Sequence, residues 1–197
     1  MPKQQNTRQK IIDAAIDLIA EKGYKGASVR KIAAKVGIRE SAIYNHFKNK
    51  EEILKEIVEQ IFTTPFETEN LEERAKKGKS FLHQFAVAYK LVSFDKRMEK
   101  LFRVMIIELF QNRKLRESFL QEFHQKDIHQ ISKALFIMMQ EGMIRSADPM
   151  FMAQEFISPL FYTRLHVSLL RIDAKSTSPI ATQFEKHVDF FWESIAL

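Results

Sequence analysis

GYKGASVRKIAAKVGIRESAIYNHF, residues 23–47, is the stretch that decides the fold. Its apolar spacing predicts one helix over 29–36 and another over roughly 40–47, with Ile43 and Phe47 turned inward. A glycine lies in the turn between the two helices. Two short helices joined by a tight glycine-containing turn form a helix-turn-helix, whose second helix can enter the major groove of DNA.

An amphipathic helix is predicted ahead of this motif, over 7–22. Its apolar residues repeat at i, i+3, i+4 and i+7: Ile12, Ala15, Ile16 and Ile19. Gly23 ends this pattern, and Ser28 is suited to cap the helix that follows. The three helices define a predicted DNA-binding domain over residues 1–50, and residues 51–197 form a second, larger domain.

Positive charge is concentrated in the first fifty residues. The 197-residue chain carries a formal charge of +6. Residues 1–50 hold eleven Lys or Arg against four Asp or Glu, a net charge of +7, whereas the other 147 residues carry −1. A basic domain on a neutral body is typical of a nucleic-acid-binding module, although a solvated basic surface would show the same asymmetry.

The composition excludes several classes of protein. The chain has no cysteine, which excludes disulfides, a thiol nucleophile and zinc–cysteine sites. It has no motif of a nucleotide-binding loop, a serine hydrolase or a zinc protease, so we predict no enzymatic activity, no cofactor and no metal. The polar N-terminus lacks a secretory signal, and no apolar run approaches the ~18 residues of a membrane span. We therefore expect a cytoplasmic protein without a membrane segment.

The outward face of the predicted 40–47 helix carries the candidate DNA contacts. The following residues can donate to, accept from or make methyl contacts with base edges: Arg39, Glu40, Ser41, Ala42, Asn45 and His46. Tyr44, Lys48 and Lys50 are placed to contact phosphates, which give affinity rather than specificity. We therefore predict double-stranded DNA as a partner; a small helical bundle without a ligand is the alternative for this pattern.

Residues 23–38, followed by 42–54, resemble the TetR family of bacterial transcriptional regulators. The second stretch reads Ala-Ile-Tyr-Asn-His-Phe-Lys-Asn-Lys-Glu-Glu-Ile-Leu. The specific likeness covers about residues 8–54, and beyond it only length and helical content agree. The resemblance implies a homodimer that releases an operator when a small molecule binds the larger domain, with the helix over 50–62 joining the two domains.

The resemblance also assigns roles to particular residues. It implies that Ser28 bonds a backbone phosphate and that Tyr44 and Lys48 touch the DNA backbone as well. The stretch 39–46 would read the major groove.

The chain departs from the family pattern at the start of this reading helix. Arg39 stands where a small capping residue is usual, and loss of a cap costs about 1 kcal/mol. Glu40 and Ser41 occupy positions often held by Lys and Gly. A carboxylate facing DNA is repelled by phosphate unless it accepts from a cytosine amino group, so these changes bear on the base sequence that is recognised.

The larger domain is predicted to be helical throughout, which makes the fold class all-α. Apolar periodicity and the few Gly and Pro residues place helices at about 80–94, 97–111, 113–142, 149–171 and 179–195. Sixteen of the seventeen Phe and seven of the eight Met lie beyond residue 61.

The helix over 97–111 is the centre of the predicted ligand site. From Leu101 to Phe110 it is apolar nearly all round, so Arg103 and Glu108, which interrupt this surface, need partners on other helices or a polar ligand group. The predicted lining, for an apolar and possibly lipid-like effector, is Phe81, Phe85, Met98, Phe102, Arg103, Met105, Glu108, Phe119, Phe123 and Met138. Ordinary core packing is the alternative for these Phe and Met residues.

The last two helices offer more apolar surface than one helix pair can hide, which predicts a homodimer interface. The predicted interface residues are Phe156, Leu160, Phe161, Leu165, Phe184, Val188, Phe191 and Ile195. A two-fold dimer fits a palindromic operator, and internal packing of these residues is the alternative. The sequence thus predicts a repressor that a small ligand releases from DNA; a helical protein-interaction module is the rival function.

Overall fold

The computed structural model describes residues 2–61 and 69–197, and their side chains except at 2–6 and 122–125. The chain divides into two compact units. Unit 1 comprises Met1–Thr63 and Lys96–Ser118, and unit 2 comprises Thr64–Asp95 and Phe119–Leu197.

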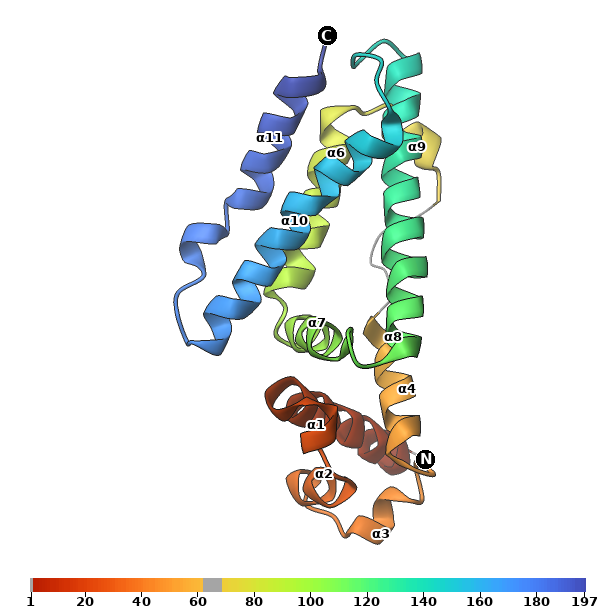
Figure 1. Ribbon diagram of the computed structural model, residues 1–197, viewed down its shortest axis with the longest axis vertical. Helices are drawn as coiled ribbons and strands as arrows, with labels where there is room; N and C mark the ends of the chain where they lie inside the picture. Colours follow the sequence, from red (N-terminus) through yellow and green to blue (C-terminus); the bar gives the residue numbers. More distant parts are fainter. Residues whose placement is uncertain (1, 62–68) are drawn as a thin grey trace. The chain divides into compact units, whose positions relative to one another are not determined.

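Unit 1 contains the predicted helix-turn-helix. Its helices are α1 (Pro2–Gly26), α2 (Val29–Val36), α3 (Glu40–Ile43), α4 (Lys50–Ile61), α7 (Lys96–Glu108) and α8 (Arg113–Ser118). Figure 1 shows α2 and α3 joined by a short turn, with α1 beside α2. The predicted helices are present, although α1 begins earlier and α3 ends sooner than the sequence pattern indicated.

The break that shapes this motif lies at Gly23. Its backbone angles (φ 69°, ψ 167°) lie in a region that favours glycine, and they interrupt α1 where the sequence predicted its end. Ser28 then caps α2, since its hydroxyl accepts a hydrogen bond from the amide of Lys31 at 3.3 Å. Gly37 ends α2 in a left-handed conformation.

The core of unit 1 joins the N-terminal helices to α7. Its main buried residues are Ile11, Ile12, Ala15, Ile16, Ile19, Ile32, Ala33, Ile43, Phe47, Ile53, Leu54, Ile57, Leu101 and Val104. Because Leu101 and Val104 belong to α7, this helix packs with the first four helices. The observed division therefore differs from the expected boundary at residue 50, because α4 and α7 supply part of the hydrophobic core of unit 1.

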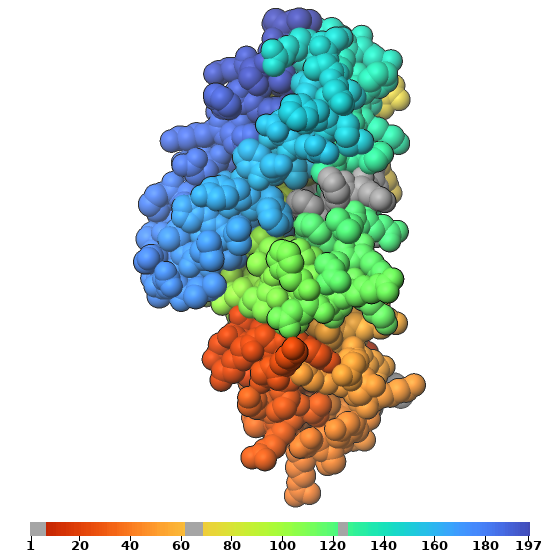
Figure 2. Space-filling model, in the orientation of Figure 1, coloured from red at the N-terminus to blue at the C-terminus, as the bar shows by residue number. Residues whose placement is uncertain are grey.

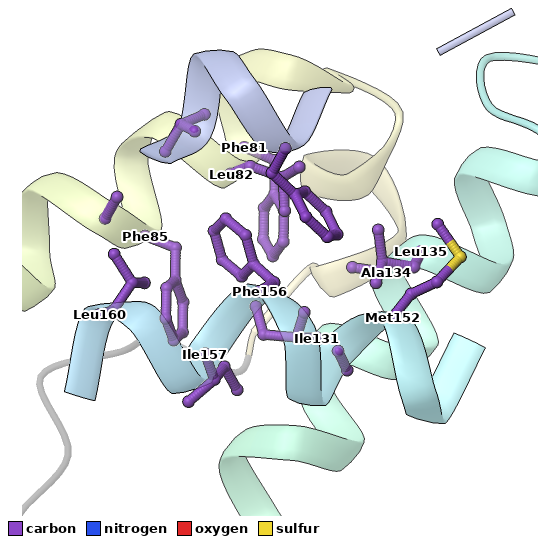
Figure 3. Packing of buried hydrophobic residues seen from close by; sticks show 14 of the residues in the cluster. Phe81, Leu82, Phe85, Ile131, Ala134, Leu135, Met152, Phe156, Ile157 and Leu160 are labelled. Carbon is purple, nitrogen blue, oxygen red and sulfur yellow. The ribbon is translucent and has the colours of Figure 1, made fainter. Parts of the chain in front are cut away.

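Unit 2 is a helical bundle. Its elements are α5 (Leu71–Ala75), α6 (Lys79–Phe94), the π-helix η1 (Phe119–Asp127), α9 (Ile128–Gln140), α10 (Pro149–Ile172), the short 3₁₀ helix η2 (Ser178–Ile180) and α11 (Gln183–Ile195). In its core, Phe156 of α10 lies among Phe81 and Phe85 of α6 and Ile131 of α9 (Figure 3). Phe85 and Phe156 have ring centroids 5.9 Å apart.

The segment 113–142, predicted as one helix, is helical along most of its length but changes type within it. The α-helix α8 passes into the wider π-helix η1, and α9 then resumes the α-helical form. The start of α10 follows the sequence pattern, because Asp148 accepts from the amides of Met150 and Phe151 and Pro149 occupies the first turn. Within the described residues, we find no helix long and apolar enough to cross a membrane.

Candidate nucleic-acid interface

The candidate interface is the outward face of α3 and the turn after it. Ile43 and Phe47 are each only 1% exposed, as the sequence predicted, and they hold this segment against the core of unit 1. The predicted base-edge residues lie on the other side: Arg39, Glu40, Ser41 and Asn45 are exposed, and Ala42 and His46 are half-buried. The structure therefore gathers polar groups of varied hydrogen-bonding character on one short, accessible segment.

Arg39 and Glu40 begin α3. Arg39 is the N-cap residue in an extended conformation and makes no capping hydrogen bond, so its side chain is not committed to the helix end. Glu40 lies in the first turn, where its carboxylate interacts favourably with the helix dipole. The guanidinium of Arg39 can thus reach outward to pair with a guanine edge.

The three residues predicted to contact phosphates differ in the structure. Tyr44 is 52% exposed, and Lys48 is exposed as well. Lys50, in contrast, donates a hydrogen bond to the carbonyl of Tyr24, and its ammonium lies 3.8 Å from the centroid of the Tyr24 ring. Burial lowers the pKa of Lys50, although Glu51 and Glu108 oppose that shift. Lys50 therefore fastens α4 to the loop after Gly23, which corrects the expectation that it faces phosphate.

The start of α2 presents a second group of polar residues. Ser28 is exposed, and because its oxygen accepts from the Lys31 amide, its hydroxyl proton remains a donor. Lys25 and Arg30, which were not among the predicted contacts, are exposed and flank Ser28 in sequence. Their position around the first turn of α2 was the available signal. Lys31 is also tied locally, since its ammonium donates to the carbonyl of Gly26 at 2.8 Å.

Arg8 contacts the residues that follow α3. Its guanidinium lies 4.2 Å from the centroid of the Phe47 ring and forms an ion pair with Glu56 of α4. One guanidinium nitrogen also donates to the carbonyl of His46 at 3.5 Å. Because the Arg8 guanidinium is held by Glu56 and contacts Phe47 and the His46 carbonyl, it limits how far the segment after α3 can shift.

The last turn of α1, after the kink at Gly23, is anchored by α7. Glu108, only 6% exposed, accepts a hydrogen bond from the backbone amide of Tyr24 at 2.7 Å. A Cβ at Gly23 would lie 3.5 Å from the same carboxylate oxygen. The Tyr24 hydroxyl donates to Glu51 at 3.1 Å, and burial, reinforced by Glu51, raises the pKa of Tyr24 to about 12. The turn that leads into the helix-turn-helix is thus fixed by one half-buried and one exposed hydrogen bond.

A second set of charged contacts joins α1 to α7. Arg97 pairs with Asp13 at 3.1 Å, and Lys100 pairs with Asp17. Lys35 of α2 lies 3.2 Å from the same Asp17 carboxylate. Burial alone would raise the pKa of Asp17, but the hydrogen bonds from Lys100 and Lys35 outweigh it and lower that pKa. Asp17 therefore connects three helices of unit 1.

The predicted ligand-site residues are divided between the two units. Met98, Phe102, Arg103, Met105 and Glu108 belong to α7 in unit 1, whereas Phe81, Phe85, Phe119 and Met138 belong to unit 2. Phe123 lies outside the residues whose side chains the structure describes.

Arg103 and Glu108, the two α7 residues predicted for the ligand site, both have protein partners, which favours the structural alternative for them. Arg103 pairs with Glu99 at 2.8 Å, on its own helix rather than on another helix as expected. Glu108 binds the amide of Tyr24. Among the residues with described side chains, we find no group of three His, Asp or Glu that could hold a metal ion.

Most of the predicted dimer-interface residues lie inside unit 2. Six of them belong to its hydrophobic core: Phe156, Leu160, Phe184, Val188, Phe191 and Ile195. Phe161 and Leu165 are half-buried. Packing within the chain, which was the alternative, explains the burial of these six residues, because α10 and α11 pack on α6 and on each other.

The two helices nevertheless expose a different apolar surface, here called the α10–α11 surface. It consists of Phe151, Tyr162, Leu169 and Ile172 on α10 and Phe190 on α11, each more than half exposed. In Figure 2 the blue atoms of α10 and α11 form a continuous part of the surface of unit 2. Helical spacing could have revealed this second stripe, since the α10 residues recur on one side of the helix.

Two family models match the chain. The model described as bacterial regulatory proteins, tetR family, matches residues 11–57, and the model described as AefR-like transcriptional repressor, C-terminal domain, matches residues 80–193. The second of these covers more than half of the chain.

Curated relatives are similar mainly over the N-terminal residues. The negative transcriptional regulator IcaR of the biofilm operon icaADBC from Staphylococcus epidermidis is 46% identical over 55 residues, which are 28% of this chain and 30% of that protein. The tetracycline repressor protein class D from Escherichia coli is 32% identical over 83 residues, 42% of this chain and 38% of that protein. The matched stretch thus spans less than half the length of these relatives.

A solved structure extends the similarity over the length of the chain. The complex of SmeT with triclosan matches with a TM-score of 0.71 and 24% identity, covering 98% of this chain and 92% of that chain. SmeT is the repressor of the multidrug efflux pump SmeDEF of Stenotrophomonas maltophilia. At this level of identity the likeness shows a shared fold.

Proposed function

The chain belongs to the TetR family of bacterial regulatory proteins, and we propose that it is a homodimeric repressor that a small, apolar ligand releases from a palindromic operator. Its relatives are DNA-binding transcriptional regulators and not enzymes. The observation that carries the proposal is the exposure of Arg39, Ser41 and Asn45 on a segment whose opposite side, Ile43, is buried.

Base reading is assigned to the exposed side of α3. Arg39 supplies a bidentate donor suited to guanine, and Asn45 supplies a donor and an acceptor suited to adenine. Glu40 can accept from a cytosine amino group. These three exposed residues give the segment the hydrogen-bonding variety that a specific site needs.

Phosphate contacts are assigned to exposed groups on both helices of the motif. Ser28, Lys25 and Arg30 surround the start of α2, and Tyr44 and Lys48 follow α3. Cationic groups at these places would neutralise phosphates and release counterions, so binding should weaken steeply with salt. Lys50 is left out because its ammonium is held by Tyr24.

Dimerisation is assigned to the α10–α11 surface. Five large apolar side chains exposed on two adjacent helices exceed what a monomer commonly leaves in water. An isologous contact through this surface would place two copies of the motif about a two-fold axis, as a palindromic operator requires.

Release from the operator is assigned to a small molecule that binds the chain. It is supported by the family and by the bound triclosan in the SmeT complex, a protein with the same fold. It also agrees with the aromatic character of unit 2, since small-molecule sites are mostly apolar with a few placed polar groups.

The experiment that tests DNA binding uses the full chain and fluorescence anisotropy. Duplexes covering the region upstream of the protein's own gene are compared with shuffled duplexes, from roughly 50 to 300 mM salt. Lys48→Ala should weaken binding to all duplexes alike and lower the salt slope by about 1 for each copy of the site. Arg39→Ala should cost about 1–3 kcal/mol on the preferred duplex and little on the shuffled one.

The matched control is Lys55→Ala, which removes a lysine 77% exposed on α4, outside the assigned contacts. It should leave both affinities nearly unchanged. Binding that ignores salt, or that is undetectable at about 50 mM, would favour the rival function, a helical protein-interaction module. Equal losses on both duplexes for Arg39→Ala would remove its assigned role in base reading.

A further inference from the structure

The end of α6 is held by an arginine of α10. The guanidinium of Arg171 donates a hydrogen bond to the carbonyl of Phe94 at 2.7 Å, and its central carbon lies 5.8 Å from the centroid of the Phe94 ring. Phe94 is the last residue of α6, so its carbonyl has no acceptor role within its own helix. A cation at this end also interacts favourably with the helix dipole. Arg171 therefore ties the end of α6 to α10 by a charge-assisted hydrogen bond.

The side chain of Phe94 adds a second attachment at the same place. It packs against the hydrophobic core of unit 2, and its ring meets that of the fully buried Phe184 edge-on, with the centroids 6.3 Å apart. The amide of the next residue, Asp95, donates to the carbonyl of Leu91 at 2.9 Å. The last turn of α6 is thus held through its backbone by α10 and through its ring by α11.

This anchored turn precedes a crossing of the chain from unit 2 into unit 1. Unit 2 reaches Asp95, and unit 1 resumes at Lys96. Asp95 alone separates α6 from α7, and its extended backbone (φ −65°, ψ 131°) ends α6. Hinges form at such positions between elements, because a change in two backbone angles redirects the next helix. At the crossing between Ser118 and Phe119, in contrast, α8 passes directly into η1.

On the other side of Asp95, the first turn of α7 is anchored in unit 1. Arg97 forms an ion pair with Asp13 of α1 and donates a hydrogen bond to the side chain of Gln60 of α4. The helix α7 also shares its hydrophobic core with the helices of the DNA-binding motif. A change of backbone direction at Asp95 would therefore carry the motif with it.

The last turns of α10 also contribute to the proposed dimer contact. Arg171 lies between Leu169 and Ile172, which are both exposed on the α10–α11 surface, whereas Arg171 is half-buried and bonds to α6. If a second copy binds this surface as proposed, the same part of α10 contacts the partner and holds the end of α6. Arg171 then links the dimer contact to the residue at which the chain leaves unit 2.

We propose that Arg171 is a positioning residue for operator binding: by holding the Phe94 carbonyl, it keeps the two DNA-binding motifs of the dimer at one separation. The inference rests on the proposed function, since it requires a dimer on a palindromic operator. One base pair more or less between the half-sites shifts them by about 3.4 Å and rotates them by about 35°. A dimer whose crossings are firmly held cannot follow that change, whereas a dimer with loosened crossings adapts to it.

The test measures how DNA affinity depends on the spacing of the half-sites. The full chain is titrated by fluorescence anisotropy with its preferred duplex and with duplexes that have one base pair inserted at, or removed from, the centre. Wild type should bind either altered duplex at least about thirtyfold more weakly. Arg171→Gln should bind the preferred duplex about three- to tenfold more weakly than wild type, and its own loss on the altered duplexes should shrink to about fivefold or less. Lower stability alone would weaken binding to every duplex by the same factor.

Three further variants make the spacing profile specific to this crossing. Asp95→Gly keeps Arg171 but widens the range of backbone angles at the crossing, so it should flatten the profile as well. Arg171→Lys retains a cationic donor for the Phe94 carbonyl and should restore most of the wild-type profile. Arg145→Gln is the matched control, because it removes an exposed arginine from the segment before α10. Profiles as steep as that of wild type in both Arg171→Gln and Asp95→Gly would overturn the inference, and so would equal flattening in Arg145→Gln.

Sedimentation velocity distinguishes failure of this inference from failure of the proposed function. Arg171→Gln should remain a dimer, with a dissociation constant within about threefold of wild type. If loss of the dimer explains all of its weaker DNA binding, the positioning role is wrong. If wild type dimerises and binds its operator while all profiles are equally steep, the proposed function stands and the inference fails. A wild-type monomer, or a chain that does not bind DNA, would overturn both.

Discussion

Helices α3 and α10 show two ways in which apolar residues relate to a core. In α3 only one side is apolar, and its Ile43 is buried while the polar side is exposed. In α10 apolar residues occur on several sides: Phe156 lies in the core, whereas Tyr162 is 65% exposed. Because α3 has a single apolar stripe, only one of its sides can face the core. The apolar residues of α10 surround more of the helix, so more than one side could face the core.

The two helices also differ in how they are held. The segment around α3 is held by the buried Ile43 and Phe47 and also by polar contacts, such as that of Arg8 with the His46 carbonyl. The inner side of α10 is positioned by aromatic packing around Phe156. Polar contacts depend on the direction of each hydrogen bond, whereas aromatic packing contributes to stability through the area that it buries. Mutations should therefore affect the two regions differently.

The largest expected effect is on the inner side of α10. Phe156→Ala should lower the free energy of unfolding by about 3–5 kcal/mol, because it leaves a cavity among Phe81, Phe85 and Phe191. Tyr162→Ala, on the exposed side of the same helix, should cost the monomer about 0.5 kcal/mol or less. Urea unfolding at one fixed protein concentration measures both. Similar losses for the two variants would remove the distinction between the two sides of α10.

The outer side of α10 is tested by self-association. Leu169→Glu should weaken the dimer by about a hundredfold, because a charge would be buried twice across the two-fold axis. Leu91→Glu is the control, since Leu91 is 67% exposed on α6, whereas Leu169 is 53% exposed on the α10–α11 surface. Sedimentation velocity over a dilution series measures the association. A wild-type monomer at micromolar concentration would refute the dimer directly.

A smaller effect is expected where α7 holds the helix-turn-helix. Glu108→Gln replaces a buried carboxylate that accepts from the Tyr24 amide and should cost about 1–2 kcal/mol of stability. DNA affinity should fall as well, because the loop before α2 is less firmly placed. Glu117→Gln is the control, as Glu117 is an exposed residue paired with Arg113 on α8. Thermal unfolding and anisotropy should show a melting temperature and a DNA affinity close to wild type for Glu117→Gln.

The smallest effect is a pH dependence at Asp17. The pKa of its carboxyl is lowered in the folded chain by Lys100 and Lys35, so its contribution is present above the ordinary carboxyl pKa and is lost as the pH falls through the lowered value. Asp17→Asn should cost about 0.5 kcal/mol at neutral pH and nothing in strong acid. Urea unfolding between those conditions measures the difference. A cost that stays constant down to strong acid would indicate lost packing instead.

The helix-turn-helix elements were predicted well because local rules determine them. Gly23 ends the regular helix, Ser28 caps α2, and Ile43 and Phe47 face inward, each from a signal within a few residues. The one misplaced side chain, Lys50, depends on a contact with Tyr24, 26 residues away. Such a tertiary contact leaves no trace in helical spacing.

Unit 2 was harder to predict because its assignments depend on which helices pack together. The sequence located Phe184 and Val188 as large apolar residues, but it could not distinguish a core from an interface. Nor could it assign α7, whose apolar surface belongs to unit 1 through Leu101 and Val104.

The place of α7 in the chain has a consequence for protein engineering. Because α4 ends at Ile61 and α7, which completes the core of unit 1, begins only at Lys96, a fragment that ends after α4 would lack Leu101 and Val104. It would expose the core residues that they cover. Chimaeric regulators built from this chain should therefore transplant Lys96–Glu108 together with the N-terminal helices rather than join parts at a single splice.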